Sequence, residues 1–330
     1  MNIVAWLRQN GFILGLLLAV GLAFLLPGPG APGGGLHPEL LNNFGVAVIL
    51  FLQGLSLAFE KIRSGAGNWR LHAIIQAFTF VIFPLVGLGL DYALPWLWPG
   101  GPASIRQGFL FLCVLPSTIS ASVVLTAVAR GNTAAALFNA ALSNLIGVVL
   151  TPLLVHLLMH RTGQTGPLGP LMLKIMTLTL LPFFVGMALR PLVKARVDAR
   201  QRWVARISNF IVCFIVYSAF CVSVAEHVWQ TQGPSVTLIL LLFVLLLFTF
   251  MSLLIHFTCR SLRLNREDLI TAYFCSVKKT LALGVPLAVL IFGHRSDLPL
   301  ILLPLMFYHP LQIFINGLLA ARWGREQVGL

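Results

Sequence analysis

Charged residues are scarce in this chain of 330 residues. Only 9% are Asp, Glu, Lys or Arg, whereas 58% are hydrophobic. A soluble globule needs far more polar surface, and the mean hydropathy of +0.93 is typical of a protein that resides in lipid. The composition therefore predicts a protein with many membrane-spanning helices and membrane lipids as its surroundings.

Acidic residues are the scarcest charged group, because the chain has only nine of them. All nine are expected in loops or at span ends: Glu39, Glu60, Asp91, Asp198, Glu226, Glu267, Asp268, Asp297 and Glu326. No carboxylate is therefore expected at the membrane centre, where it would ordinarily neutralise sodium or relay protons.

Patterns of catalytic and metal-binding residues are also missing. The five cysteines fall in or at the ends of apolar stretches without a CxxC pair, so neither disulfides nor structural zinc are expected. Hydrolase, kinase and dinucleotide-binding signatures are absent, which argues against an enzyme and against an organic cofactor. A formal charge of +13 could suggest nucleic acid, but the basic residues form short clusters between apolar stretches, so membrane topology explains them better.

Long apolar stretches dominate what is present. Crossing about 30 Å of hydrocarbon takes roughly 20 apolar residues, and ten stretches meet this requirement. They are residues 12–27, 40–59, 71–90, 108–128, 133–159, 168–189, 207–225, 236–257, 269–292 and 298–321. The sequence thus predicts an all-α membrane protein with ten transmembrane helices.

Basic residues indicate the orientation. With a cytoplasmic N-terminus, sixteen of the twenty-two Lys and Arg residues fall on the inner side, and only Arg106, Arg161 and Arg295 fall outside. Both termini are therefore predicted to be cytoplasmic. An alternative is that the first stretch is a cleaved signal peptide, but its loss would disturb this alternation of charge.

A hydrophilic stretch at 190–206 divides the ten spans into two sets of five. Because five is odd, a repeat of five spans is inverted in the membrane. The sequence predicts one transporter domain over residues 1–330, with one repeat at about 12–159 and the other at about 168–321.

Polar residues interrupt the fourth span of each half. The interruptions are PSTISAS, from Pro116 to Ser122, and CSVKKT, from Cys275 to Thr280. Proline removes a backbone donor and frees carbonyl groups, so we expect non-helical backbone between Leu115 and Ser120. A simple kink could explain the first interruption alone. The matching position of the second favours a binding site, since broken helices in corresponding places are typical of transporters.

Two lysines lie deep inside the ninth span. Lys278 and Lys279 would each cost about 2.5 to 3.5 kcal/mol at the centre of a helix, and both interfaces are too far for snorkelling. We therefore expect a functional role for at least one of them. A regular helix could direct only one squarely into a central cavity, and the sequence does not decide which. Lysine without a carboxylate gives a positive cavity that favours an anionic substrate.

Other polar residues inside the spans include Gln76, Thr79, Asn139, Ser143 and Asn316. Each by itself is more often a hydrogen-bonding contact between helices than a ligand, and such contacts contribute only about 0.6 to 2 kcal/mol.

The interruptions also carry a family resemblance. The stretch from Pro116 to Val155, together with FCSVKKTLALGVP from Phe274 to Pro286, resembles the bile acid:sodium symporter superfamily and most closely its bacterial SBF-like subgroup. The resemblance covers nearly the whole chain. It implies a 5+5 inverted repeat, a mobile panel against a core, and a crossing of discontinuous fourth and ninth helices where ligands bind. It also implies a bacterial inner membrane.

Sodium ligands of the better-known branch are only partly present in this sequence. The resemblance places Ser122 on a ligand serine, but Cys275 on a ligand glutamate and Lys279 on a ligand glutamine. Sodium coupling of the familiar kind is therefore in question. The residues expected to bind substrate or ion are Gln76, Thr79, Thr118, Ser120, Ser122, Thr126, Asn139, Ser143, Cys275, Ser276, Lys279 and Thr280.

Two functions remain open from the sequence. The first is a secondary transporter of an organic or other small anion, working by alternating access and coupled to Na⁺ or H⁺. The second is a regulatory membrane protein that affects calcium or envelope homeostasis without moving a substrate, as a vertebrate relative of the subgroup suggests.

Lys279 supports a specific hypothesis within the first function. Its ammonium would take the place of a bound cation, donating to Ser and Thr hydroxyls and to the carbonyls freed by the interruption. Burial disfavours the charged form of lysine, so loss of the proton could couple transport to protons. The rival hypothesis is that Lys279 faces the cavity and pairs with an anionic substrate.

Overall fold

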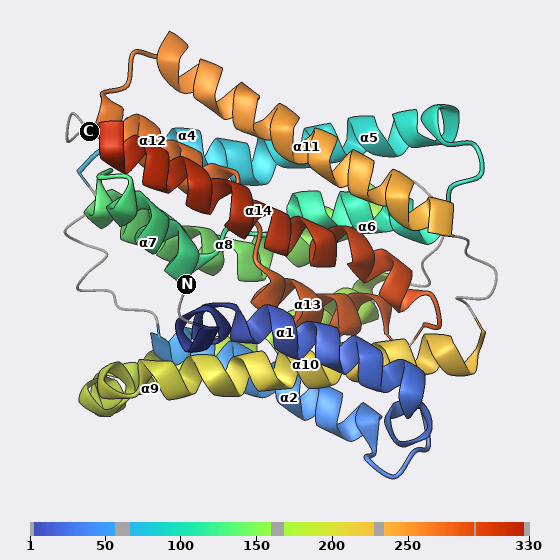
Figure 1. Cartoon of the computed structure of the whole chain (residues 1–330). Helices are drawn as coiled ribbons and strands as arrows, with labels where there is room; N and C mark the ends of the chain where they lie inside the picture. Colours follow the sequence, from blue (N-terminus) through green and yellow to red (C-terminus); the bar gives the residue numbers. More distant parts are fainter. Residues whose placement is uncertain (1–2, 57–66, 160–167, 228–233, 294, 327–330) are drawn as a thin grey trace. The chain divides into compact units, whose positions relative to one another are not determined.

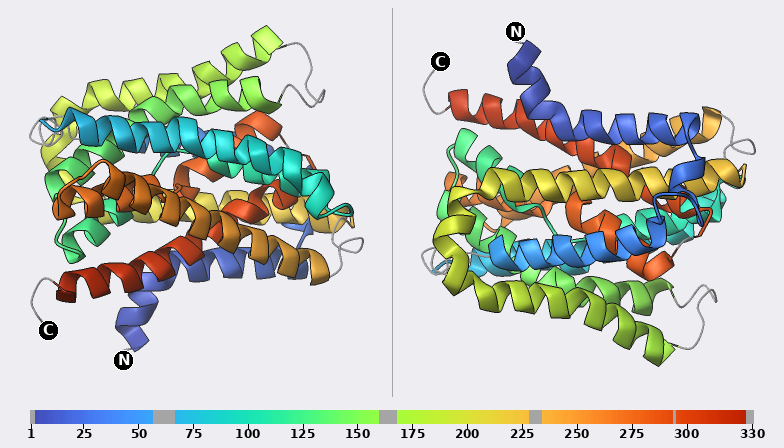
Figure 2. Two further views of the ribbon diagram at one scale, coloured as in Figure 1. Left: turned by 90° about the horizontal axis from the view of Figure 1, so that it is seen from above. Right: turned by 90° about the horizontal axis from the view of Figure 1, so that it is seen from below.

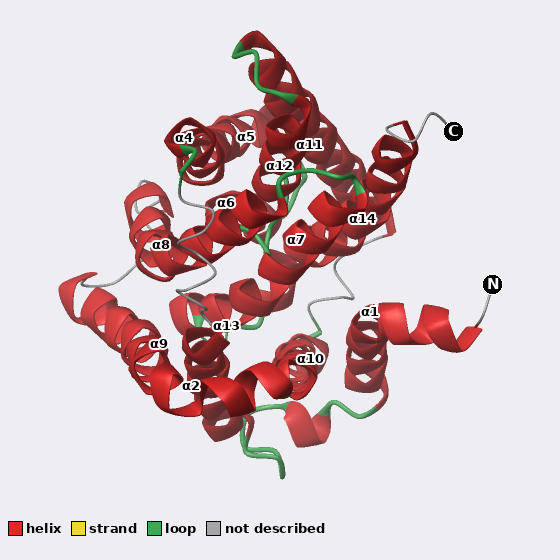
Figure 3. Cartoon of the chain, turned by 90° about the vertical axis from the view of Figure 1, so that its left-hand side faces the viewer, coloured by secondary structure: helices red, strands yellow, loops and turns green. Residues whose placement is uncertain are grey.

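The described part of the chain is helical throughout. The computed structural model describes residues 3–56, 67–159, 168–227, 234–293 and 295–326, and these residues contain helices and loops but no strand (Figure 3). The all-α class predicted from the sequence is confirmed for this part.

Figure 1 shows the helices of the described residues, coloured in chain order. In chain order they are α1 (Ile3–Leu25), the 3₁₀ turn η1 (Gly28–Gly30), α2 (Pro38–Ser56), α4 (Trp69–Ala77), the π-helical segment η2 (Phe78–Ile82), α5 (Phe83–Leu97), α6 (Ala103–Val114), α7 (Ile119–Val128), α8 (Thr133–Met159), α9 (Leu168–Ala199), α10 (Gln201–Ala225), α11 (Pro234–Ser261), α12 (Arg266–Ser276), α13 (Leu281–Phe292) and α14 (Leu298–Glu326).

Seven helical segments of the described chain are long and apolar enough to cross a membrane. They are Pro38–Ser56, Trp69–Leu97, Thr133–Leu158, Gln201–Ala225, Ser235–Ser261, Arg266–Phe292 and Leu298–Glu326. Two shorter apolar helices, Gly11–Leu25 and Ala103–Val114, accompany them. Each of the ten predicted spans overlaps at least one helix, and residues 71–90, 108–128 and 269–292 each overlap more than one. The hydrophilic stretch at 190–206 is largely helical, because α9 continues to Ala199 and α10 begins at Gln201.

Contacts divide the chain into two compact units, of which the first contains Met1–Leu57, Pro167–Val236 and Ala282–Leu302. Within it, α10 packs against α1 and α2, and α2 packs against α9 (Figure 2, right). The backbones of α2 and α9 meet at two glycines. A Cβ atom on Gly54 would lie 2.0 Å from the carbonyl oxygen of Phe183, and one on Gly186 would lie 2.1 Å from that of Phe51. Only glycine permits this approach, which is a common way to pack membrane helices.

The second unit contains Ala58–Gly166, Thr237–Leu281 and Leu303–Leu330. Within it, α5 packs against α6, and α12 packs against α4, α7 and α8. The later part of α14 lies beside α12, where the Trp323 ring is 5.1 Å from that of Tyr273 (Figure 1). Both interruptions predicted from the sequence belong to this unit.

Candidate functional site

The first interruption separates α6 from α7. Helix α6 ends at Val114 and α7 begins at Ile119, with Leu115 in an extended conformation (φ −72°, ψ 149°). Pro116 follows directly and has no N–H to continue the helical ladder. The predicted non-helical backbone between Leu115 and Ser120 is therefore confirmed.

The second interruption separates α12 from α13 over residues 277–280. Two side chains of α14 bind its backbone. Tyr308 donates its hydroxyl to the carbonyl oxygen of Val277 at 2.7 Å. Gln312 accepts the backbone N–H of Lys279 and donates to the carbonyl oxygen of Lys279, both at 2.8 Å. The side-chain amide of Gln312 thus replaces the helical partners that Lys279 lacks.

Direct hydrogen bonds join the two interruptions. The backbone N–H of Thr280 donates to the carbonyl oxygen of Pro116 at 3.0 Å. One turn into α7, Ser122 donates its hydroxyl to the carbonyl oxygen of Phe274 at 3.1 Å. Ser117 completes the group, with its oxygen 3.4 Å from that of Ser122. Segments far apart in the sequence are held together by the backbone groups that the interruptions free.

Helix α8 satisfies two more of the freed carbonyls. Asn144 donates its side-chain amide to the carbonyl oxygen of Ser117 at 3.0 Å, and Thr151 donates its hydroxyl to that of Val114 at 2.9 Å. The helix approaches closely because it has a glycine at the contact. A Cβ on Gly147 would lie 2.6 Å from the ring of Pro116. The first interruption is thus packed and hydrogen-bonded, which a simple bend of a continuous helix would not require.

Lys279 is fully buried between these segments, and its ammonium has three acceptors. Its Nζ donates to the carbonyl oxygens of Leu115 at 2.7 Å, Cys113 at 3.0 Å and Thr79 at 3.3 Å. It also lies 4.0 Å from the centroid of the Phe83 ring, a distance suited to a cation–π contact. The partners expected from the sequence were hydroxyls as well as carbonyls. The hydrogen bonds described for this ammonium go to carbonyls alone.

The acceptors of Lys279 arise from two irregular places in the backbone. Cys113 and Leu115 lie at the end of α6, where no following helical turn takes their carbonyls. Thr79 lies in the π-helical segment η2, whose wider turn also disturbs the regular ladder. An ammonium with three donors fits such a cluster of carbonyls.

Lys278 is equally buried but has no comparable partners. Within the described residues its Nζ has no hydrogen bond. The centroid of the Phe274 ring lies 5.7 Å from this Nζ. The two adjacent lysines therefore have different surroundings, although both side chains are fully enclosed.

A second polar group connects α4 with α8. The amide of Gln76 donates to the backbone and side-chain oxygens of Asn139 at 3.3 Å and accepts the hydroxyl of Ser143 at 3.0 Å. Asn139 also lies 2.8 Å from Nδ1 of His72. Among the described contacts, this group is separate from the hydrogen bonds between the interruptions.

The remaining predicted residues are distributed around these two groups. The hydroxyl of Thr79 returns to the carbonyl of Ile75 at 2.8 Å, and Cys275 donates to the carbonyl of Ala136 at 3.8 Å. The hydroxyl oxygens of Thr118, Thr126 and Ser276 are buried without a hydrogen bond among the described residues. The side chain of Ser120 lies outside the described part of the structure.

Several residues of this region were not among those expected to bind, including His72, Thr151, Tyr308 and Gln312. Polar side chains within spans are usually contacts between helices, so no single one of them was distinctive. Tyr308 and Gln312 did carry a weak signal, because they are four residues apart and therefore share a face of the tenth predicted span.

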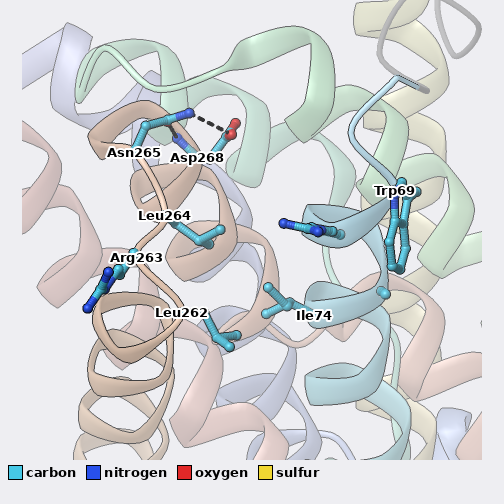
Figure 4. Close-up of a pocket in the computed structure, with 9 residues that line it drawn as sticks. Trp69, Ile74, Leu262, Arg263, Leu264, Asn265 and Asp268 are labelled. Atoms are coloured by element: carbon cyan, nitrogen blue, oxygen red, sulfur yellow. Dashed lines mark hydrogen bonds between the residues drawn. The ribbon is translucent and has the colours of Figure 1, made fainter.

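A pocket of about 460 Å³ lies at another place in the second unit. Figure 4 shows Leu262 and Leu264, from the turn between α11 and α12, on one side of it, and Ile74 of α4 on the other. Arg263 lies at the edge of this pocket, and Asp268 lies beyond Leu264 (Figure 4).

Asp268 is held by amide groups. Its carboxylate accepts hydrogen bonds from Asn68 at 2.7 Å, Asn265 at 2.9 Å and Asn132 at 3.3 Å. Because Asn68 precedes α4, Asn132 precedes α8 and Asn265 caps α12, this acid connects the starts of three helices. Its arrangement indicates a structural role.

The helices and interruptions define a class of protein. Several helices are apolar enough to span a membrane, and two helical segments are broken within the described chain and hydrogen-bonded to each other. Broken membrane-spanning helices are typical of secondary transporters.

The chain belongs to the SBF-like CPA transporter family, whose model matches residues 10–325. It is 36% identical to the protein "Uncharacterized protein PA2026" of Pseudomonas aeruginosa, over 96% of this chain and 94% of the relative. It is 34% identical to "Putative symporter YfeH" of Escherichia coli, over 96% of this chain and 93% of the relative. It is 30% identical to "Sodium/bile acid cotransporter 7" of Danio rerio, over 97% of this chain and 95% of the relative. The resemblance to the bile acid:sodium symporters is confirmed, and the protein is a multi-pass membrane transporter of that type.

Proposed function

We propose that the protein moves a small anion, organic or inorganic, across a bacterial inner membrane by alternating access, without changing it chemically. The observation that carries the proposal is the pair of buried lysines at the second interruption. Neither lysine has a carboxylate partner among the described residues. Buried positive charge without an acid produces a potential that attracts anions.

The proposed architecture has ten spans arranged as two inverted sets of five, with both termini in the cytoplasm. Support comes from the interruptions, which fall in the fourth predicted span of each set and are hydrogen-bonded to each other. The division of the chain also supports it. The first unit combines the first two predicted spans of each set, and the second unit combines spans three to five of each, apart from α13 and the start of α14. This division of spans matches the panel and the core that the family resemblance implies.

Lys279 is proposed to act as a tethered cation. Its ammonium occupies a cluster of three carbonyl oxygens from η2 and the end of α6, and so connects η2, α6 and the second interruption. The ammonium already occupies these three carbonyl oxygens, and no acid is described beside them that would favour a metal ion in its place. On this proposal sodium is not required at this position, and a coupling ion, if used, is the proton.

Uptake measurements test the proposal. Inverted or right-side-out membrane vesicles containing the protein are compared with vesicles lacking it, using radiolabelled carboxylates, phosphate and bile acids with choline or sodium as the counter-ion. The proposal expects accumulation of at least one anion in sodium-free medium. Absence of protein-dependent uptake of every one of these anions, with either counter-ion, would contradict it.

A further inference from the structure

Lys278 is a buried charged residue whose ammonium has no hydrogen-bond partner among the described residues. Most buried polar atoms in folded proteins have a partner, because leaving a donor unpaired in the interior is costly. The adjacent Lys279, with three acceptors, shows that the same backbone can satisfy an ammonium.

Two more unpartnered polar side chains belong to this part of the second unit. Ser276 ends α12 two residues before Lys278, and its hydroxyl is buried without a hydrogen bond in the described structure. Asn316 of α14 is fully buried, and neither its amide nitrogen nor its oxygen has a described partner.

Helix geometry places Asn316 beside the second interruption. It follows Gln312 by four residues and precedes Trp323 by seven, so all three lie on one face of α14. Gln312 binds the backbone of Lys279, and the ring of Trp323 lies 5.5 Å from that of Phe274. Asn316 therefore lies along the segment between Phe274 and Lys279, which contains Ser276 and Lys278.

We propose that Lys278, Ser276 and Asn316 bind the transported anion. An ammonium, a hydroxyl and an amide can each donate hydrogen bonds to the oxygens of a carboxylate or another oxyanion, and the ammonium supplies the compensating charge. The inference rests on the proposed transport of an anion and adds the ligands. It also assigns different roles to the two lysines: Lys279 stabilises the second interruption and Lys278 binds the substrate.

The first test uses the purified protein without ligand. Replacing Lys278 by methionine removes an unpaired buried charge while keeping an apolar stem, so Lys278→Met is expected to unfold at the same or a higher temperature than the unaltered protein. Lys279→Met leaves three carbonyls without their donor and is expected to unfold at a lower temperature. Equal destabilisation by the two substitutions would overturn the inference, because it would mean that Lys278 also has a structural partner.

The second test measures binding of acetate, succinate, inorganic phosphate and cholate, added as choline salts, by their effect on the unfolding temperature. For the probe that stabilises the unaltered protein most, Lys278→Met is expected to lower affinity by about tenfold or more. Asn316→Leu should weaken the same probe without destabilising the protein. Arg202→Gln, which removes an exposed positive charge from α10, is the control and should retain the affinity.

The outcomes separate this inference from the proposed function. If a probe stabilises the unaltered protein and Lys278→Met retains the full effect, anion binding stands and the assignment to Lys278 is wrong. If no probe stabilises the unaltered protein, the anionic substrate is wrong, and the ligand role of Lys278 is wrong with it.

Discussion

The backbone N–H of Thr280 donates to the carbonyl oxygen of Pro116 at 3.0 Å. Each residue lies in an interrupted helix, and each group is available for this bond because the local helical ladder has ended. A backbone hydrogen bond between interruptions depends on the shape of both segments rather than on one side chain. A substitution that alters the backbone conformation of one interruption should therefore also affect the conformation of the other.

Gln312 provides the clearest test of how the second interruption is held. Gln312→Leu removes one acceptor and one donor that serve Lys279, so we expect a loss of about 1 to 3 kcal/mol in stability. The measurement is thermal unfolding of the purified protein in detergent. Gln201→Leu, at the exposed start of α10, is the matched control and should have little effect. An unchanged unfolding temperature for Gln312→Leu would show that the interruption is stable without this amide.

Lys279 determines the ion dependence on the proposed mechanism. Lys279→Ala and Lys279→Gln should both lose uptake driven by a proton gradient, because the group that would carry the proton is absent. The resemblance aligns Lys279 with a glutamine that binds sodium in the sodium-coupled branch. Lys279→Gln restores this residue, so the variant is expected to gain some dependence on sodium. Uptake in vesicles with imposed proton or sodium gradients checks both expectations.

A different result would favour the rival role for Lys279. If the unaltered protein needs sodium at every pH, and Lys279→Ala regains full uptake at high substrate concentration, the tether is wrong. Lys279 would then be a ligand of the substrate.

Gly54 should be intolerant of any side chain. In Gly54→Ala the new methyl group would meet the carbonyl oxygen of Phe183 at 2.0 Å, so α2 and α9 must separate. We expect a loss of roughly 1 to 3 kcal/mol, which is typical of overpacking. Gly21→Ala is the control, since nothing lies within 4 Å of the added atom and alanine favours the helix. Equal unfolding temperatures for the two variants would contradict the close approach of α2 and α9.

The orientation can be tested with reporter fusions. Fusions after Arg70, Arg202 and Arg325 should report a cytoplasmic location, and those after Gly101, Gly166 and Gly233 an external one. Alkaline phosphatase and a fluorescent protein report the two sides independently. A consistent reversal at one position would require a different number of spans before it.

The interruptions show why part of the site was predictable. Pro116 cannot donate a backbone hydrogen bond, and two lysines cannot sit in an apolar helix without compensation, so both breaks could be located from residue chemistry alone. The hydrogen-bond partners of each lysine could not be predicted from the sequence. The prediction used the 100° spacing of a regular helix, but the backbone at Lys278 and Lys279 is not helical.

The partners of Lys279 illustrate a second limit. They are the backbone carbonyls of Thr79, Cys113 and Leu115. Because every residue has a backbone carbonyl, the sequence does not mark which ones accept a hydrogen bond. The sequence predicted carbonyls freed by the interruption, which Cys113 and Leu115 provide, and also Ser and Thr hydroxyls, which do not bind this ammonium among the described hydrogen bonds. Gln312 was missed for a related reason, since its two bonds go to the backbone of a segment that only the fold brings beside α14.

The carbonyl cluster around Lys279 also bears on charge movement. A sodium ion bound at a site is captured and released in every cycle, and it carries its charge across the membrane with the substrate. An ammonium joined to the chain never leaves, and its effective concentration at the site does not depend on the medium. If Lys279 stays charged throughout the cycle, a monovalent anion crosses the membrane without a co-transported cation to balance its charge. Each turnover then moves one net negative charge and generates a current. The direction of this current reports the sign of the substrate's charge. A cycle in which the lysine gives up its proton to the opposite side would instead be electrically silent for such an anion.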